Sequence, residues 1–234
     1  MILAQEIIGK IAAQTDRAIL FHSATGKDSI ALLNLMAPHF KEIVCVFMYT
    51  VKNLTHINRY IAWAQKKYQN CRFIQIPHYG VYSWIKIGYM GCNKNPKQKK
   101  YTLAELNEKV RENTGIEWSF FGFKQSDSLN RRVMLRGYEQ QAICEKSKKV
   151  YPLSSYKNAD VLSYIERNSL ITPESYGGEH QSSGSDINDI HYLLWLRNNY
   201  PDDLKKIYSV FPMVERLVFD YDNNNYGEET NKAE

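Results

Sequence analysis

The chain has 234 residues, of which 44% are hydrophobic and 24% charged, a balance that excludes the polar, highly charged composition of a disordered protein. This length fits one substantial core, so we expect a single α/β domain with a C-terminal extension. The net charge of +5 favours an anionic ligand but falls well short of a dedicated nucleic-acid-binding composition.

The sequence contains no run of about 20 apolar residues, the length that a membrane span requires. Its first residues carry Glu6 and Lys10, where a signal peptide would be apolar. We therefore expect a cytoplasmic protein with no membrane partner. The four cysteines lack CxxC or other metal-ligand spacing, which argues against disulfides, zinc and iron–sulfur clusters: Cys45, Cys71, Cys92 and Cys144.

Apolar periodicity predicts alternating helices and strands along the first three quarters of the chain. Helices are expected over residues 3–12, 28–36, 54–68, 101–113 and 157–167, and strands over 18–21, 42–49, 71–76 and 117–121. Alternating elements of this kind form parallel strands joined by right-handed crossovers. The sequence thus predicts a doubly wound, mostly parallel sheet with helices on both faces, a three-layer α/β/α fold with a helical C-terminal extension.

The C-terminal region has its own pattern. Residues 187–217 look helical, with interruptions at Pro201 and Pro212, whereas residues 220–234 are polar and lack an apolar face. We expect a nucleotide-binding α/β domain over 1–176, a helical extension packed on it over 177–219, and a flexible tail over 220–234. The apolar surface of the extension must pack on the core or form a homodimer.

The first candidate site is the turn between the strand at 18–21 and the helix at 28–36, with the sequence SATGKDS. Gly26 lets a phosphate approach the backbone closely, and the helix that follows offers unpaired N–H groups and a positive dipole end. Four side chains add donors: Ser23, Thr25, Lys27 and Ser29. The spacing does not match GxxxxGK[ST]. The alternative is a helix cap formed by Ser23 or Thr25.

This turn resembles the SGGKDS pyrophosphate-binding loop of the PP-loop ATP pyrophosphatases and of the phosphoadenosine phosphosulfate (PAPS) reductases. The residues that match its second half are Gly26, Lys27, Asp28 and Ser29. Ala24 and Thr25 depart from the pattern, which removes one hydroxyl donor and adds a side chain beside the phosphate.

The segment FFGFKQSDSLNRR at 120–132 resembles a second PAPS reductase signature, through Gly122, Lys124, Asp127, Ser128 and Arg131. A strand end would present Lys124 while the next helix presents Ser128 and Arg131, which surrounds a sulfate or phosphate with donors. Lys124 stands where arginine is common, so the bidentate fork is lost. The alternative is a solvated basic helix with Asp127 in its first turn.

A third segment, at 151–171, resembles the family through residues that we interpret as structural: Pro152, Leu153, Asp160, Val161, Tyr164 and Ile165. By the same resemblance, the adenine would lie near residues 49–51. PAPS reductases of the assimilatory type use a C-terminal cysteine to take sulfite from the nucleotide, and this chain has no cysteine after Cys144. PAPS reduction of that type is therefore not expected.

The resemblance instead implies an ATP pyrophosphatase-type reaction that yields AMP and pyrophosphate and serves sulfur or nucleic-acid modification. The ligand would be ATP or a PAPS-like adenine nucleotide, with Mg²⁺ held by Asp28. The implied catalytic residues are Lys27, Asp28, Lys124 and Arg131. The implied phosphate-binding residues are Ser23, Thr25, Gly26, Lys27, Ser29, Gly122, Ser128 and Arg131. The alternative is a non-catalytic nucleotide sensor on the same fold.

Four lysines crowd the segment at 91–100: Lys94, Lys97, Lys99 and Lys100. With the nearby Tyr89 and Tyr101 they could guide a nucleic-acid acceptor, and the alternative is a solvated loop. The acceptor of the reaction could equally be a small molecule.

Overall fold

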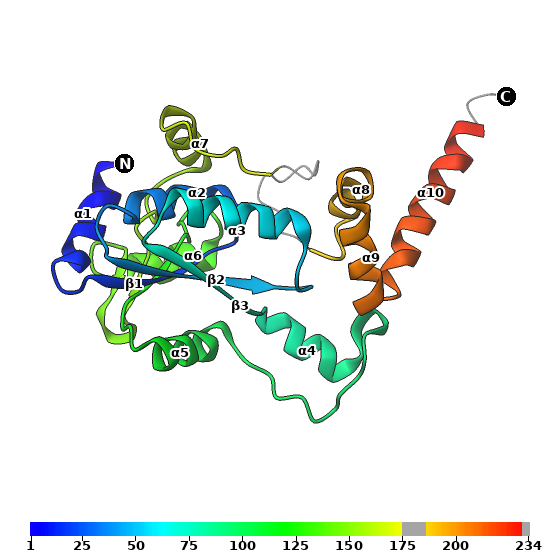
Figure 1. Ribbon diagram of the computed structural model, residues 1–234, viewed down its shortest axis with the longest axis horizontal. Coiled ribbons are helices and arrows are strands. Elements are labelled where there is room, and N and C mark those ends of the chain that lie inside the picture. The colour runs from blue at the N-terminus through cyan, green and yellow to red at the C-terminus, as the bar shows by residue number, and fades with distance from the viewer. Residues whose placement is uncertain (175–185, 231–234) are drawn as a thin grey trace. The chain divides into compact units, whose positions relative to one another are not determined.

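The computed structural model describes residues 1–174 and 186–230 (Figure 1). The chain divides into two compact units. The first unit contains residues 1–48, 59–76 and 103–174, and the second contains 49–58, 77–102 and 175–234. This division differs from the linear boundaries expected at 176 and 219, because two internal segments group with the C-terminal helices. Residues 177–185, at the start of the expected extension, lie outside the described residues.

The first unit is built on a sheet with the strand order β3-β2-β1-β4-β6-β5. The strands are β1 (Arg17–Phe21), β2 (Glu42–Tyr49), β3 (Cys71–Pro77), β4 (Ser119–Phe121), β5 (Ile143–Cys144) and β6 (Lys149–Val150). β1 pairs in parallel with β2 and with β4, and β4 pairs in parallel with β6, while β5 runs antiparallel to β6. The predicted mostly parallel sheet is thus confirmed.

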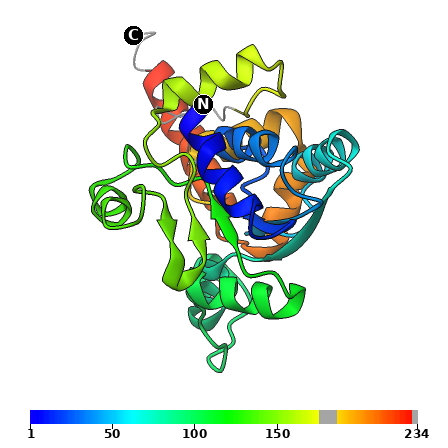
Figure 2. The same cartoon turned by 90° about the vertical axis from the view of Figure 1, so that its left-hand side faces the viewer.

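Helices cover both faces of this sheet, and Figures 1 and 2 show α2 (blue) and α5 (green) on opposite sides of it. The helices with most or all of their residues in the first unit are α1 (Ile2–Ala12), α2 (Lys27–Met36), α3 (Thr55–Lys67), α5 (Leu103–Thr114), α6 (Leu129–Arg136) and α7 (Asn158–Arg167). α1 and α7 both pack on α2. Val110 of α5 and Leu135 of α6 share a buried cluster with Ile19 and Phe21 of β1. The three-layer α/β/α architecture is therefore confirmed.

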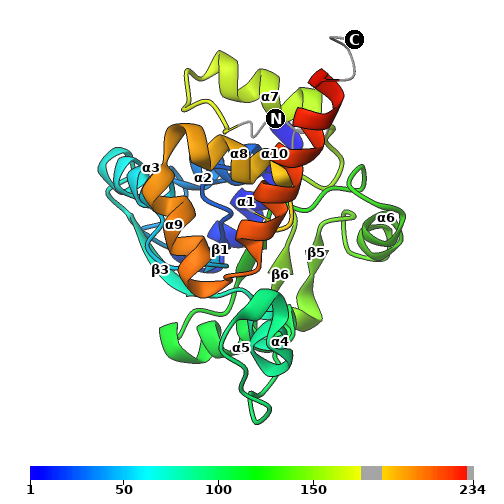
Figure 3. The same cartoon turned by 90° about the vertical axis from the view of Figure 1, so that its right-hand side faces the viewer.

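The second unit is helical. It contains α4 (Tyr79–Ile87), a 3-10 turn η1 (Tyr89–Gly91), α8 (Ile190–Asn199), α9 (Pro201–Val210) and α10 (Val214–Thr230). α8, α9 and α10 pack against one another (Figure 3). Pro201 opens α9, where its missing N–H costs nothing, and α10 continues beyond residue 220, where the tail was expected to begin. None of the helices in the described part of the chain is long and apolar enough to cross a membrane.

A buried pair of side chains, His56 and Asp203, fixes the start of α3 to α9 within the second unit. The Asp203 carboxylate is fully buried and lies 3.0 Å from His56 Nδ1 and 2.8 Å from Lys206 Nζ. Burial acts to raise the pKa of Asp203, but hydrogen bonds from Lys206, Thr55 and His56 outweigh it and hold the pKa well below its usual range. Burial lowers the pKa of His56 despite the neighbouring carboxylate. This pair has a structural role in joining two distant segments.

Candidate functional site

The loop between β1 and α2 is closed by its own hydroxyl groups. The backbone N–H of Ser23 donates to Ser29 Oγ at 2.9 Å, and the two serine hydroxyls lie 2.9 Å apart. A Cβ added to Gly26 would lie 2.3 Å from Ser23 Oγ, so a larger residue here would displace the Ser23 hydroxyl from its contact with Ser29. Gly26 is also the N-cap of α2. The unpaired N–H groups in the first turn of α2 therefore lie directly beside this compact loop.

The two residues that depart from the family pattern also shape the loop. Ala24 has a φ of +53°, a left-handed conformation that costs a non-glycine residue roughly 1 to 2 kcal/mol. The backbone carbonyl of Thr25 accepts a hydrogen bond from the N–H of Glu174 at 3.3 Å. The loop is thus held from the side by the segment that follows α7.

Five charged side chains form a continuous network next to the loop. Lys124 Nζ lies 2.8 Å from Asp28 Oδ1 and 2.9 Å from Asp127 Oδ1, and the Lys124 side chain is only 1% exposed. Lys27 Nζ lies 3.4 Å from Asp28 Oδ2, and Arg131 Nη1 lies 2.6 Å from Asp127 Oδ2. Three cations thus face two carboxylates, which leaves one net positive charge at the N-terminus of α2.

Asp127 is the centre of the half of this network that belongs to the β4–α6 segment. Burial acts to raise the pKa of its carboxyl group, but hydrogen bonds from the Lys124 amide, the Lys124 ammonium and the Arg131 guanidinium outweigh it, so the pKa is lowered. Arg131 is also fixed from its other side, with its guanidinium 4.0 Å from the centre of the Phe123 ring. The Ser128 hydroxyl accepts from the N–H of Arg131 at 3.2 Å, so it caps α6.

The fold brings the two predicted motifs together because β1 and β4 are parallel neighbours. Phe21 pairs with Phe121 at their carboxyl ends, and ligands of open α/β sheets bind at this edge. A Cβ added to Gly122 would lie 3.1 Å from the Cβ of Asp28. Gly122 therefore allows α2 to lie close to the end of β4. Of the predicted site residues, Lys27, Asp28, Lys124 and Arg131 form one network, whereas Ser128 and Gly122 serve the backbone.

His22, which the sequence analysis did not single out, lies at the junction between β1 and the loop. Its side chain is buried, its Nε2 lies 3.2 Å from the Tyr60 hydroxyl, and burial lowers its pKa to about 3. The neutral imidazole packs against the rings of Tyr60 and Phe73. The only signal in the sequence is a polar residue that ends the apolar run AILF.

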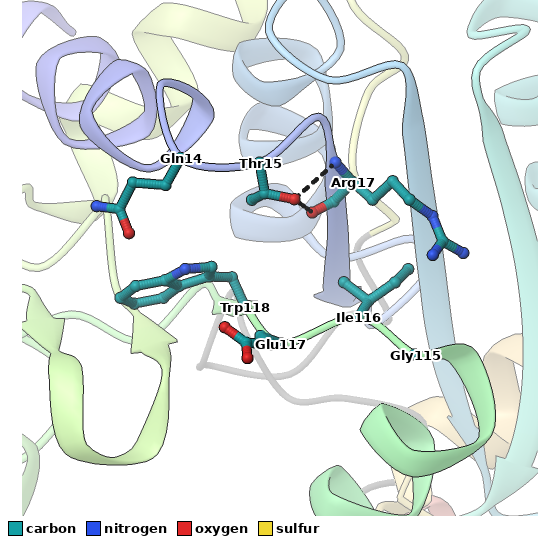
Figure 4. A pocket seen from close by; sticks show the side chains of 7 residues that line it. All are labelled: Gln14, Thr15, Arg17, Gly115, Ile116, Glu117 and Trp118. Atoms are coloured by element: carbon teal, nitrogen blue, oxygen red, sulfur yellow. Dashed lines mark hydrogen bonds between the residues drawn. The ribbon is translucent and has the colours of Figure 1, made fainter.

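A cavity of about 240 Å³ lies elsewhere in the first unit, at the edge where β1 and β4 begin (Figure 4). It is lined by Gln14, Thr15 and Arg17 and by residues 115–118. Thr15 Oγ1 bonds to the backbone of Arg17, whose guanidinium is held by Glu42 at 2.6 Å and by the Thr114 carbonyl at 3.2 Å. Since the Thr15 hydroxyl and the Arg17 guanidinium are already engaged by the protein itself, we place the candidate site at the loop.

The family comparison covers all three segments that resemble the PAPS reductases. The profile of the phosphoadenosine phosphosulfate reductase domain matches residues 18–185. Among solved structures, the chain is similar to an NH3-dependent NAD synthetase from Campylobacter jejuni subsp. jejuni, at 13% identity and a TM-score of 0.48, over 93% of this chain and 90% of that chain. No curated protein matches the chain.

Proposed function

The chain belongs to the phosphoadenosine phosphosulfate reductase domain family, a family of adenine-nucleotide-binding PP-loop proteins, and on this premise we propose that it binds an adenine nucleotide at the loop of residues 23–29. The observation that carries the proposal is the charged network around the buried Lys124, beside the first N–H groups of α2. A helix N-terminus, a glycine and one excess positive charge lie together here, and each of them favours the binding of a phosphate.

The reaction that this arrangement supports best is cleavage of ATP between its α- and β-phosphates. Water or an acceptor would attack the α-phosphorus, the bond to the bridging oxygen would break, and pyrophosphate would leave with the electron pair. Lys27 and the loop amides would stabilise the negative charge on the leaving pyrophosphate. Lys124 and Arg131 would neutralise charge on the remaining phosphate. Catalysis of this kind is electrostatic and needs no side-chain nucleophile.

Magnesium would have only one protein ligand at this site. Among residues 1–174 and 186–230, no three His, Cys, Asp or Glu side chains form a group that could hold a metal ion. Both Asp28 oxygens face ammonium groups, of Lys124 and of Lys27. A single carboxylate suits Mg²⁺ when nucleotide phosphates supply further oxygens. Asp28 would fit that role when phosphate oxygens pair with Lys27 and Lys124 in its place.

The experiment is calorimetric titration with ATP, AMP and PAPS in the presence of Mg²⁺, followed by analysis of products in the same samples. We expect ATP binding together with release of AMP and pyrophosphate, and loss of turnover in Lys27→Ala and in Asp28→Ala. Lys146→Ala, at an exposed lysine outside the site, is the matched control. A folded Lys27→Ala protein with full turnover would rule the reaction out.

A second candidate is a nucleotide sensor that binds without catalysis. Two observations favour it: the Asp28 carboxylate lies within ion-pair distance of two lysines, and the hydroxyls of Ser23 and Ser29 bond to each other. Both features stabilise the loop without a metal. The sensor is distinguished in the same titration, because it predicts binding of ATP with no AMP or pyrophosphate formed.

A further inference from the structure

The charges of this chain are strongly segregated along the sequence. Between Glu42 and Glu105 there are ten lysines and arginines and no aspartate or glutamate. The chain as a whole has 30 basic and 25 acidic residues, so all the residues outside this stretch together carry a net negative charge. Such an asymmetry indicates that the acid-free stretch faces a polyanion.

Half of these cations lie in residues 77–102, which form α4, η1 and the loop that follows them in the second unit. The five lysines of this segment are Lys86, Lys94, Lys97, Lys99 and Lys100. The four in the loop are exposed, and none of them forms an ion pair with a carboxylate in the described part of the chain. By contrast, Lys41 and Lys205 are as exposed but each pairs with an aspartate. The loop lysines are thus available to an anion.

The loop that carries them has a defined backbone conformation. The N–H of Asn95 donates to the Ile85 carbonyl at 2.8 Å, and the N–H of Gln98 donates to the Asn95 carbonyl at 3.0 Å. At its start, Gly88 ends α4 with a φ of +74°, and the Met90 carbonyl accepts from the N–H of Met213 at 3.0 Å. Because the backbone is already ordered, binding would cost less conformational entropy.

Aromatic side chains accompany the lysines. Tyr101 lies edge-on to Tyr82 with ring centres 4.9 Å apart, and Lys99 Nζ lies 5.2 Å from the centre of the Tyr101 ring. Trp84 and Tyr89 stack with centres 5.3 Å apart. These rings are partly exposed. Cations that track a phosphate backbone, together with rings on which bases stack, are how proteins bind single-stranded nucleic acid.

We propose that residues 77–102 form a binding surface for single-stranded nucleic acid, in which the loop lysines contact phosphates and Tyr101 stacks on a base. The surface belongs to the second unit, whereas the loop of residues 23–29 belongs to the first. Binding is measured without ATP, so a failure of the nucleotide reaction and a failure of this proposal are distinguishable.

The test is fluorescence anisotropy of the full chain with labelled single strands of RNA or DNA of about 20 nucleotides, which exceed the site of one binding fold. The variant replaces Lys94, Lys97, Lys99 and Lys100 with glutamine. The control makes the same change at four other exposed lysines: Lys41, Lys146, Lys157 and Lys205. Both proteins lose four positive charges, so only the position of the charges differs.

We expect the salt dependence of binding to change in the loop variant alone. Single strands contribute a slope of about −0.7 per phosphate contacted, so loss of four contacts flattens the plot of log K against log salt by about 3. Between about 50 and 200 mM salt, the unmodified protein should lose about fifty-fold more affinity than the variant. The proposal would be overturned if the salt slope flattened equally in the loop variant and in the control. It would also be overturned if the unmodified protein did not bind single strands at low salt.

Stacking is tested separately. Tyr101→Leu should weaken binding about fivefold or more, while Tyr101→Phe, which keeps the ring, should not. Unchanged affinity of the leucine variant, or equal affinity for a duplex of the same sequence, would overturn the assignment to single strands. Preferential binding to phosphatidylserine vesicles would overturn it in favour of an anionic membrane surface.

Discussion

The buried Lys124 gives the sharpest test of the site, through the substitution Lys124→Met. Methionine keeps an unbranched apolar stem, one atom shorter than lysine, but leaves two carboxylates without their shared cation. Removing one member of a buried ion pair costs about 3 to 5 kcal/mol. Asp28 and Asp127 each keep a second cation, at 3.4 Å and 2.6 Å, and are 23% and 18% exposed. We therefore expect the lower end, about 3 kcal/mol of unfolding free energy.

The assay is urea unfolding followed by circular dichroism, with Lys146→Met as a control at an exposed lysine that should change little. In a background of Asp28→Asn with Asp127→Asn, the cost of Lys124→Met should shrink, because the carboxylates no longer need a counter-charge. A cost below about 1 kcal/mol, or the same cost in that background, would refute the reasoning.

Three further predictions follow from single contacts. Gly26→Ala should weaken nucleotide binding, measured by calorimetry, because its Cβ would lie 2.3 Å from Ser23 Oγ and would displace that hydroxyl. Since burial lowers the pKa of His22 from 6.5 to about 3, the unfolded state alone takes up a proton in that range. The free energy of unfolding in urea should therefore decrease as the pH falls below 6.5, by up to about 1.4 kcal/mol per pH unit. His22→Gln should reduce this dependence on pH. Asp203→Asn should cost about 2 kcal/mol, whereas Asp202→Asn, at a surface pair, should have no measurable effect on urea unfolding.

Local patterns were enough to predict most of the elements of the first unit. Apolar periodicity is a property of neighbouring residues, so the strand at 18–21 and the helix at 28–36 could be predicted before their packing was known, and they correspond to β1 and α2. β5 and β6 were not predicted because strands of two residues cannot show alternation. α4 was missed because its sequence, YGVYSWIKI, contains a glycine and is rich in β-branched and aromatic residues, which are weak helix formers.

The sequence by itself determined the loop, its glycine, and the adjacency of Lys27 and Asp28, because these follow from residues within one turn of chain. The contact of Lys124 with Asp28 was decided by the tertiary structure alone. The two residues are far apart in the chain and meet only because β4 pairs beside β1. The grouping of 77–102 with the C-terminal helices is likewise invisible in the sequence, since it depends on which buried surfaces match after folding.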